Sequence, residues 1–417
     1  MPPANRELTR AINQFHVLNE IRKAGCLSRV EIAELTGQSR SSVTTITALL
    51  MDQGLILEKK THKPTARGRR RTMLTLNPEA AYVVGVKISA FQISFAVVDF
   101  KASVKASLIM PIRTGQKPVQ FMADVIEEGV RHCVAQCRLS LDDISGIGIG
   151  VPGFVDSTTG ICHWTPLYKP GEIPLQDLMR QRLGVTTVIE NDANAVTVGE
   201  QWFGLGVGID NFIVVTIEHG VGMGIVVHGA LYRGATGVGA EVGHMVVIPD
   251  GEPCRCGKKG CIEAYVSDYS ILRRAKAVLE QRRDKPNLDM LTIEDVTEMA
   301  RKGDAAMAKL FREGGEMLGL GVAGLIQIFN PERVIITGEG VRAGDLMFAS
   351  TIKTTKKLLN KEVREAAEII IQEWADDDWA RGAAGFMLSE LYQSPLDTVH
   401  SMLGEHIRHP SPGGIVP

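Results

Sequence analysis

One segment of the chain gathers residue types that bind transition metals. Residues 243–263 read GHMVVIPDGEPCRCGKKGCIE, with Cys254, Cys256 and Cys261 following His244 on a glycine-rich loop. Thiolates and imidazoles ligate Zn²⁺ in tetrahedral structural sites, and a closed set of four ligands leaves no position for an activated water. We therefore expect these four side chains to hold a structural zinc ion. The alternative is a set of buried free cysteines beside an unrelated histidine.

The N-terminal segment has the pattern of a helix-turn-helix. Apolar residues recur at helical intervals over residues 8–21. Ser28, with Glu31 three positions later, predicts a capping box at the start of a short helix over residues 29–36. After a turn at the following glycine, Ser39 is the expected N-cap of a third helix. Three short helices in this order are typical of DNA-binding domains.

The third helix, residues 39–50, would present small hydroxyls and one arginine to DNA. Its apolar side consists of Val43, Ile46, Leu49 and Leu50. Its polar side suits base edges and phosphates in a major groove. The candidate contacts on this helix are Ser39, Arg40, Ser41, Ser42, Thr44 and Thr45.

Two strand-like runs after the third helix predict a wing. They are LILEKK and RRRTMLTL, joined by the turn-rich THKPTARG. The tip carries Arg67, Arg69, Arg70 and Arg71, a cluster that suits phosphates or a narrow minor groove. Double-stranded operator DNA is the expected partner, and the alternative is a helical protein-interaction module with a basic hairpin.

The charge distribution separates a basic head from an acidic body. Through Leu76 the chain has 13 Lys and Arg against 6 Asp and Glu, whereas the remainder has 33 against 42. This asymmetry indicates that only the head meets a polyanion, although a solvated basic face would look the same by charge alone. There is no secretion signal and no apolar run of membrane-spanning length, so we expect a cytoplasmic protein with no membrane partner.

The body alternates short apolar strands with helices, which predicts an α/β fold with two central sheets. Strand-like runs are VVGVKI, ISFAVVDF, SLIMPI, ISGIGIG, TTVIEND, FIVVTI, GIVVHG and RVIITG. Helices are expected over residues 118–138, 268–282, 293–313 and 315–329. No internal sequence repeat is evident. The sequence thus predicts a winged helix over residues 1–76, joined at Asn77-Pro78-Glu79 to the body.

Five motifs in order resemble the ROK family of repressors and sugar kinases, specifically its transcriptional-regulator branch. They are GIGIGVPGFVD (146–156), ENDANAVTVGE (190–200), GVGMGIVVHGALYRG (220–234), EVGH (241–244) and CRCGKKGCIE (254–263). The resemblance covers nearly the whole chain. It implies a two-lobed actin-like, hexokinase-like (ribonuclease H-like) domain, a sugar held between the lobes, a zinc ion beside it, and a homodimer or homotetramer.

The resemblance also implies the limits of the lobes. A small lobe would span residues 77–195 and be completed by a C-terminal helix over 380–393, and a large lobe with the zinc loop 244–263 would span 196–379. Residues 394–417 would form a tail, and its end, HPSPGGIVP, has the composition of a disordered segment.

The sugar-contacting residues are carried over from the family motifs. They are Asn191, Asp192, Glu241, His244 and Glu263. Carboxylates, an amide and an imidazole suit a ligand whose hydroxyls both donate and accept hydrogen bonds. One nitrogen of His244 would bind zinc and the other would face a sugar hydroxyl. The alternative for the two residues of ENDAN is loop capping.

The phosphate-binding side departs from the family's kinases. Where they have an Asp-x-Gly-Gly-Thr-like loop, this chain has Lys87-Ile88-Ser89-Ala90-Phe91, and two glutamates, Glu218 and Glu339, stand in the later nucleotide segments. Phosphoryl transfer depends on positioning and on stabilising charge around the phosphates. We therefore read Asp192, the family's catalytic base, as vestigial, with Lys87 offering a point charge for the phosphate of a sugar.

The sequence accordingly favours a sugar-responsive transcriptional repressor of carbohydrate genes whose effector is a sugar or sugar phosphate. The alternatives are an ATP-dependent sugar kinase with an added DNA-binding domain, and a scaffold or activator that binds DNA constitutively.

Overall fold

A computed structural model describes residues 4–59, 72–115, 117–165, 172–235, 237–282, 287–375 and 377–392. These residues form two compact units. The first comprises the described parts of residues 1–82, 99–103 and 388–417, and the second comprises those of residues 83–98 and 104–387. Two expected features, the arginine-rich wing tip and the C-terminal tail, lie outside the described residues.

The first unit is built from three helices and a small sheet. The strands lie in the order β1-β3-β2, and both pairings are antiparallel. The elements are α1 (Ala4–Ala24), β1 (Leu27–Ser28), α2 (Arg29–Thr36), α3 (Arg40–Asp52), β2 (Ile56–Lys59), β3 (Met73–Leu76) and the 3-10 turn η1 (Pro78–Ala80).

The two helix starts expected from the capping residues are confirmed. The Ser28 hydroxyl accepts from the Glu31 backbone N–H, and the Glu31 carboxylate accepts from the Ser28 backbone N–H at 2.8 Å. Ser39 caps α3 by accepting from the Ser42 backbone N–H at 3.1 Å. Each cap satisfies amide groups that have no partner within the helix.

The third helix has one buried side and one exposed side, as its sequence pattern predicts. Val43, Ile46 and Leu50 are buried in the core of the first unit, together with Thr47. The opposite side is exposed to solvent at Ser39, Arg40, Ser41, Thr44 and Thr45, and Ser42 is half-buried. The hydroxyls of Thr44 and Thr45 donate to backbone carbonyls one turn earlier, which leaves their oxygens as acceptors on the exposed face.

Two later segments of the chain complete the first unit. The Phe100 and Tyr392 rings stack with centroids 4.6 Å apart, and the Tyr392 hydroxyl donates to the Phe100 carbonyl at 3.2 Å. Lys101 Nζ donates to Thr75 Oγ1 at 2.9 Å, and that hydroxyl donates to the Gly25 carbonyl. No sequence pattern indicated that these distant segments pack with the N-terminal residues.

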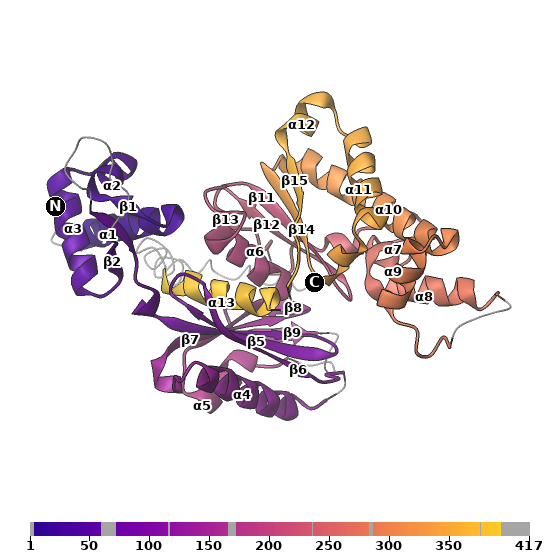
Figure 1. Cartoon of the computed structure of the whole chain (residues 1–417), viewed down its shortest axis with the longest axis horizontal. Coiled ribbons are helices and arrows are strands. Elements are labelled where there is room, and N and C mark those ends of the chain that lie inside the picture. The colour runs from indigo at the N-terminus through magenta and orange to yellow at the C-terminus, as the bar shows by residue number, and fades with distance from the viewer. Residues whose placement is uncertain are drawn as a thin grey trace, which may run out of the picture. The chain divides into compact units, whose positions relative to one another are not determined.

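The second unit contains two five-stranded sheets (Figure 1). The first sheet consists of β4 (Tyr82–Ile88), β5 (Gln92–Asp99), β6 (Val104–Pro111), β7 (Ile144–Val151) and β10 (Thr187–Asn191). The second consists of β11 (Phe212–Ile217), β12 (Val221–Val227), β13 (Ala230–Leu231), β14 (Arg333–Thr337) and β15 (Glu368–Ile371). A separate hairpin is formed by β8 (Phe154–Asp156) and β9 (Ile161–Trp164).

The two sheets share one topology. The first has the order β10-β7-β4-β5-β6 and the second β15-β14-β11-β12-β13, so in each the earliest strand is central. In each, the last two strands pair in parallel and the second and third pair antiparallel. The body is therefore a structural repeat. The expected strands are confirmed. Strand β15 and the duplication were not predicted, because the order of strands within a sheet produces no repeating pattern in the sequence.

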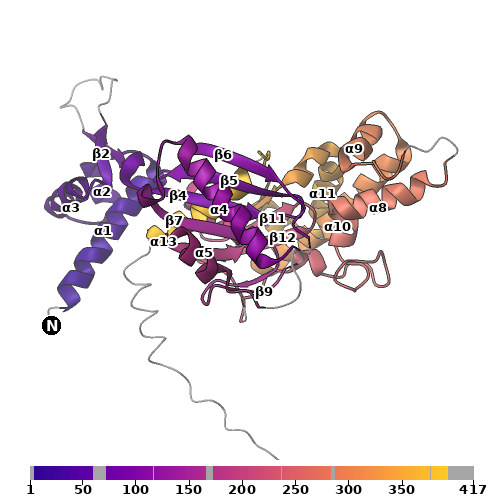
Figure 2. The same ribbon diagram turned by 90° about the horizontal axis from the view of Figure 1, so that it is seen from below.

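Helices α6 (Asp192–Phe203) and α13 (Asp378–Leu391) lie between the sheets, and glycines bring their backbones close. A Cβ on Gly85 of β4 would lie 1.8 Å from the Ala380 carbonyl oxygen, and one on Gly382 of α13 would lie 2.9 Å from Val196 Cα of α6. The far face of the first sheet is covered by α4 (Val119–Gln136) and α5 (Leu175–Leu183) (Figure 2).

The second sheet is backed by a helical layer. The helices are α7 (Glu263–Val266), α8 (Asp268–Leu279), α9 (Ile293–Arg301), α10 (Ala305–Phe329), α11 (Asp345–Leu358) and α12 (Lys361–Ala366). Short 3-10 turns are η2 (Leu141–Asp143), η3 (Val242–His244) and η4 (Glu339–Ala343).

The expected helix break near residue 314 is wrong. The chain breaks instead at Gly303, whose φ of 98° is in the left-handed region, and Asp304 then caps α10 by accepting from the Ala306 and Met307 N–H groups. Within α10, a Cβ on Gly315 would lie 2.1 Å from the Met347 carbonyl oxygen of α11. This glycine permits close helix packing and does not end the helix.

One substitution at two sites of α10 should have opposite effects. Gly315→Ala forces Cβ into the α11 backbone, so we expect a loss of about 2 kcal/mol or more. Gly324→Ala meets nothing within 4 Å and should stabilise the protein by up to about 1 kcal/mol, because alanine favours helix. Urea unfolding followed by circular dichroism measures both, and equal effects would contradict this account of the helix contact.

Candidate functional site

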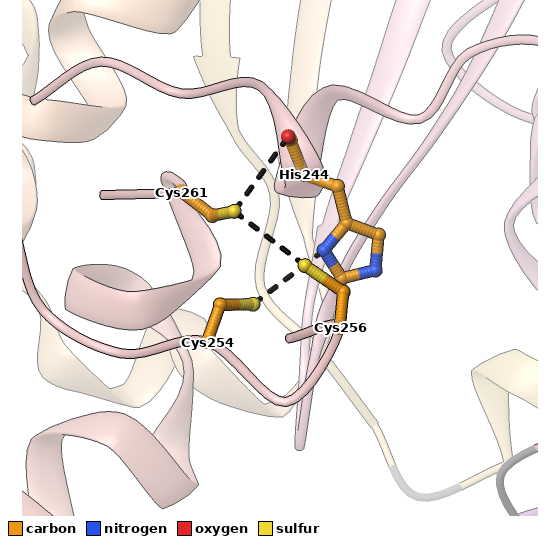
Figure 3. Close-up of side chains that lie close together, drawn as sticks. All are labelled: His244, Cys254, Cys256 and Cys261. Atoms are coloured by element: carbon orange, nitrogen blue, oxygen red, sulfur yellow. Dashed lines mark hydrogen bonds between the residues drawn. The ribbon is translucent and has the colours of Figure 1, made fainter. Parts of the chain in front are cut away.

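The four expected metal ligands converge. His244 lies on η3, the three cysteines lie on the loop before α7, and the ligand atoms all lie within 4.8 Å of one another. Cys254 Sγ is 3.6 Å from His244 Nδ1, and Cys256 Sγ is 3.7 Å from Cys261 Sγ (Figure 3). The fold of the loop thus brings His244 together with the three cysteines that follow it ten or more positions later.

Two of the distances within this cluster, whose ligand atoms all lie within 4.8 Å of one another, fit a tetrahedral metal. Bond lengths of about 2.3 Å to sulfur and 2.0 Å to nitrogen place neighbouring ligand atoms about 3.5–3.8 Å apart. The sulfur–sulfur distance of 3.7 Å and the sulfur–nitrogen distance of 3.6 Å match that geometry. The cluster can hold a metal ion, with His244 offering Nδ1.

The two residues of the ENDAN motif have structural roles at the start of α6. Asn191 is the N-cap: its Oδ1 accepts from the Asn194 N–H at 3.2 Å, and its Nδ2 donates to the Gly153 carbonyl at 3.0 Å. Asp192 Oδ1 accepts from the Ala193 N–H at 2.9 Å, and its Oδ2 pairs with Lys87. The capping alternative therefore describes what Asn191 does in this structure.

The two glutamates of the expected sugar set lie near the metal cluster. Glu263 is buried: its Oε1 accepts from the Tyr269 hydroxyl at 3.1 Å, and its Oε2 accepts from the Val221 N–H at 3.1 Å. Partial desolvation raises the pKa of Glu241, and the nearby charges of Asp192 and Glu263 raise it further. The structure therefore brings the acidic members of the set together beside His244.

An ion pair between a half-exposed arginine and a buried glutamate, which the sequence did not reveal, fixes the ENDAN turn. Glu190 Oε2 accepts from Nε and Nη2 of Arg233 at 3.0 and 2.8 Å. Its Oε1 accepts from the Asn191 N–H and from the Asn194 side chain. Glu190 is 1 % exposed, so Arg233 ties this turn of the first sheet to the loop that leads to Glu241. Glu190 is visible in the sequence as the acidic first residue of ENDAN, but its partner Arg233 lies 43 residues away and could not be identified from the motif.

Lys87 is the centre of a second buried network. Its side chain is 1 % exposed, and its Nζ pairs with Asp192 and, at 3.3 Å, with Glu218 Oε2. Burial alone would lower the pKa of Lys87, but the Asp192 and Glu218 carboxylates together raise it. Its charge is thus balanced within the protein, which does not support the expectation that Lys87 attracts an anionic ligand.

Three alternate residues, at the end of β4 and in the turn that follows it, contact the facing β11–β12 turn. Besides the Lys87 pair, Ser89 Oγ donates to Glu218 Oε1 at 3.0 Å, and the Phe91 ring meets His219 edge-on with centroids 5.6 Å apart. These contacts therefore join the two sheets of the second unit directly. Glu218, expected from sequence to repel phosphate, is here a partner of Lys87.

Trp379 and Glu339 complete this network. Lys87 Nζ lies 3.9 Å from the centroid of the Trp379 ring, and Trp379 Nε1 donates to Glu339 Oε1 at 3.1 Å. Burial and the Glu218 charge raise the pKa of Glu339 to about 8. The sequence indicates four members of this network as separate departures from the kinase pattern, namely Lys87, Ser89, Glu218 and Glu339. It does not indicate Trp379, because nothing in the local sequence distinguishes that residue.

These features define a winged-helix protein with an actin-like α/β domain that carries a candidate metal centre. A family model described as the ROK family matches residues 83–390, and one described as the MarR family matches residues 7–71. The chain therefore belongs to the ROK family, and its N-terminal unit is a MarR-type winged helix.

Curated relatives match along most of both chains. A xylose repressor from Caldicellulosiruptor bescii is 30% identical and covers 82% of this chain and 86% of its own. The xylose repressor of Bacillus subtilis is 27% identical over 93% of this chain and 98% of its own. The Escherichia coli DNA-binding transcriptional dual regulator NagC is 28% identical over 82% of this chain and 84% of its own.

Solved structures support the fold and include kinases. A ROK family transcriptional regulator, described as a homologue of the E. coli MLC protein, has a TM-score of 0.76 over 94% of this chain and 98% of its own, with 24% identity. A ROK family glucokinase from Streptomyces griseus, in complex with glucose and AMPPNP, is 31% identical and has a TM-score of 0.63 over 73% of this chain and 98% of its own. No helix among the described residues is long and apolar enough to cross a membrane.

Removal of a metal ligand should unfold the loop that precedes α7. We expect about one zinc ion per chain in the purified protein, and Cys261→Ser should lower the metal content and the melting temperature. Cys137→Ser, a free cysteine on the far side of the first sheet, is the control and should change neither. Elemental analysis and thermal unfolding measure the two effects; wild-type melting that is insensitive to a chelator would contradict a structural metal.

Glu339 should make stability depend on pH. Its pKa is raised from 4.5 to about 8, so the folded state keeps a proton that the unfolded state releases. That contribution to stability is present below pH 4.5 and is lost as pH rises through about 8. Relative to the wild type, Glu339→Gln should gain several degrees in melting temperature between pH 5 and pH 9. A difference that does not vary with pH would contradict a protonated Glu339.

Proposed function

We propose that this chain is a sugar-responsive, DNA-binding transcriptional repressor of carbohydrate-metabolism genes. The observation that carries the proposal is the Lys87 network, which would take the place of a phosphate-binding loop, beside the acidic residues of the expected sugar set. The names of the relatives support it, since two of them are xylose repressors and a third is a DNA-binding transcriptional regulator.

DNA recognition is assigned to the winged helix. The exposed polar side of α3 would enter a major groove with Ser39, Arg40, Ser41, Ser42, Thr44 and Thr45. The wing arginines Arg67, Arg69, Arg70 and Arg71 would contact phosphates. A homodimer or homotetramer would set the spacing of two such heads on a near-palindromic operator.

Sugar binding is assigned to the polar cluster beside the metal centre. Asp192, Glu241, His244 and Glu263 would contact hydroxyls, and Asn191 would do so with the hydrogen-bonding capacity left over from its capping role. Zn²⁺ held by His244, Cys254, Cys256 and Cys261 would supply structure only. With Nδ1 of His244 on the metal, its Nε2 is left for the ligand.

The same cluster explains how a sugar would change the protein's state. Asp192 is both an expected sugar contact and a partner of Lys87, so a sugar hydroxyl that bonds Asp192 alters the joint between the two sheets. A ligand shifts a conformational equilibrium only by its difference in affinity for the two states. Because Asp192 lies on that joint, it provides such a difference.

A second candidate function is an ATP-dependent sugar kinase, which the 31% identity to a glucokinase favours. Against it stands the Lys87–Asp192 pair. Asp192, which would be the base, is paired with a buried ammonium, and Phe91, Ser89 and Glu218 would stand where a kinase is expected to bind phosphate.

Gel-shift measurements on the protein's own upstream DNA test the proposal. We expect binding at low salt that weakens when D-xylose, D-glucose, N-acetylglucosamine or one of their phosphates is added. Arg40→Ala should weaken binding about tenfold, because it removes a contact to DNA. Arg131→Ala, a surface arginine of α4 that pairs with Glu127, is the matched control. Glu263→Ala should keep DNA binding but lose the sugar response.

The kinase alternative is tested on the same preparations. Incubation with ATP and each sugar should release no sugar-dependent ADP. Release that Asp192→Asn abolishes would establish the kinase and overturn the vestigial assignment. Absence of any gel shift at low salt would overturn DNA binding, and a shift that no sugar alters, or that Glu263→Ala leaves fully responsive, would overturn the assigned sensor.

A further inference from the structure

Arg255 is a fixed cation beside the metal centre. It lies between Cys254 and Cys256, and its side chain is exposed. Its guanidinium carbon lies 3.7 Å from the centroid of the Tyr269 ring, and its Nη1 contacts His219 Nε2. Stacking and the histidine contact hold the planar group in one orientation without neutralising it.

The groups that hold Arg255 carry no negative charge. Since a guanidinium only donates, His219 Nε2 must accept, which requires a neutral imidazole. Burial and the Arg255 charge lower the pKa of His219 to about 4, in agreement with that assignment. Tyr269 is likewise neutral, because its hydroxyl donates a hydrogen bond to Glu263 Oε1 at 3.1 Å.

This absence of an acidic partner distinguishes Arg255 from the arginines around it. Arg233 pairs with Glu190, Arg274 with Glu313, and Arg342 with Asp268. Among the described residues, no carboxylate lies within ion-pair distance of Arg255, and its one side-chain hydrogen bond is to His219. Four of its five N–H donors are therefore left for another partner.

Arg255 is also adjacent to the expected sugar set. The Tyr269 ring on which it stacks donates its hydroxyl to Glu263 Oε1 at 3.1 Å, and the Arg255 backbone N–H points to the same hydroxyl at 3.4 Å. A ligand held by Glu263 would therefore present its substituents close to the guanidinium. Lys87 is excluded as their counterion, because two carboxylates already balance its charge.

We propose that Arg255 binds the phosphate of a phosphorylated sugar, so that the effector of this protein is a sugar phosphate and not the neutral sugar. The proposal rests on the sugar-sensing function proposed above and names the chemical class of its ligand. A phosphate monoester carries close to two negative charges at neutral pH, and its oxygens match the guanidinium fork in a bidentate contact.

Isothermal titration of the full-length protein tests this assignment with matched pairs of ligands. The pairs are D-glucose and glucose 6-phosphate, N-acetylglucosamine and its 6-phosphate, and D-xylose and xylose 5-phosphate, with glucuronate as a carboxylate probe. For at least one pair, the phosphate should bind about tenfold more tightly at low salt, and added salt should reduce that advantage.

Two charge-matched variants locate the effect. Arg255→Gln should bring the affinity ratio of phosphate to neutral sugar to about one and leave the affinity for the neutral sugar unchanged. Lys259→Gln removes an exposed cation from the same loop and should keep the ratio. Zinc content, measured for all three proteins, should be equal, which shows that the loop is intact.

The outcomes separate this inference from the proposed function. Neutral sugars that bind as tightly as every phosphate, or equal losses for both ligands in Arg255→Gln, would overturn the role of Arg255 while sugar sensing stands. A preference for glucuronate over all phosphates would overturn the phosphate assignment. If no sugar of either kind binds the wild type, sugar sensing fails and this inference fails with it.

Discussion

The buried ammonium of Lys87 is the interaction on which the contact between the two sheets of the second unit depends. It lies at the end of the central strand of the first sheet and is balanced by Asp192 from the same half and Glu218 from the second sheet. Removing one member of such a pair leaves an uncompensated charge in the interior, at a cost of about 3–5 kcal/mol. The joint between the sheets and the orientation of Asp192 both depend on this one charge.

The departures from the kinase pattern are coupled and are best understood as one change. A buried lysine at position 87 requires nearby acids, and Glu218 supplies one of them. Ser89 donates a hydrogen bond to Glu218, and the Trp379 ring packs against the Lys87 ammonium. Glu339 remains protonated near neutral pH, which limits the negative charge in the network. A single reversion would therefore leave partners unpaired within this buried network.

Prediction from the sequence succeeded where the determining interactions are local. Ser28 and Glu31 lie one helical turn apart and fixed the start of α2, and alternating apolar runs fixed the central strands. The predicted helix break at residue 314 was wrong, because the sequence does not distinguish a glycine that ends a helix from one that allows close packing against a residue such as Met347. It also missed Arg233 and Trp379, whose partners are far away in the chain.

The sequence by itself determined the elements, the four ligand types of the metal cluster and the family, because cap residues, periodicity and close motif spacing are properties of short segments. Only the tertiary structure decided that Lys87 is neutralised, that Asn191 caps a helix, and that Arg255 forms no ion pair with any carboxylate of the described residues. Charge balance depends on every group within a few ångströms, and those groups come from strands and loops that the chain brings together only on folding.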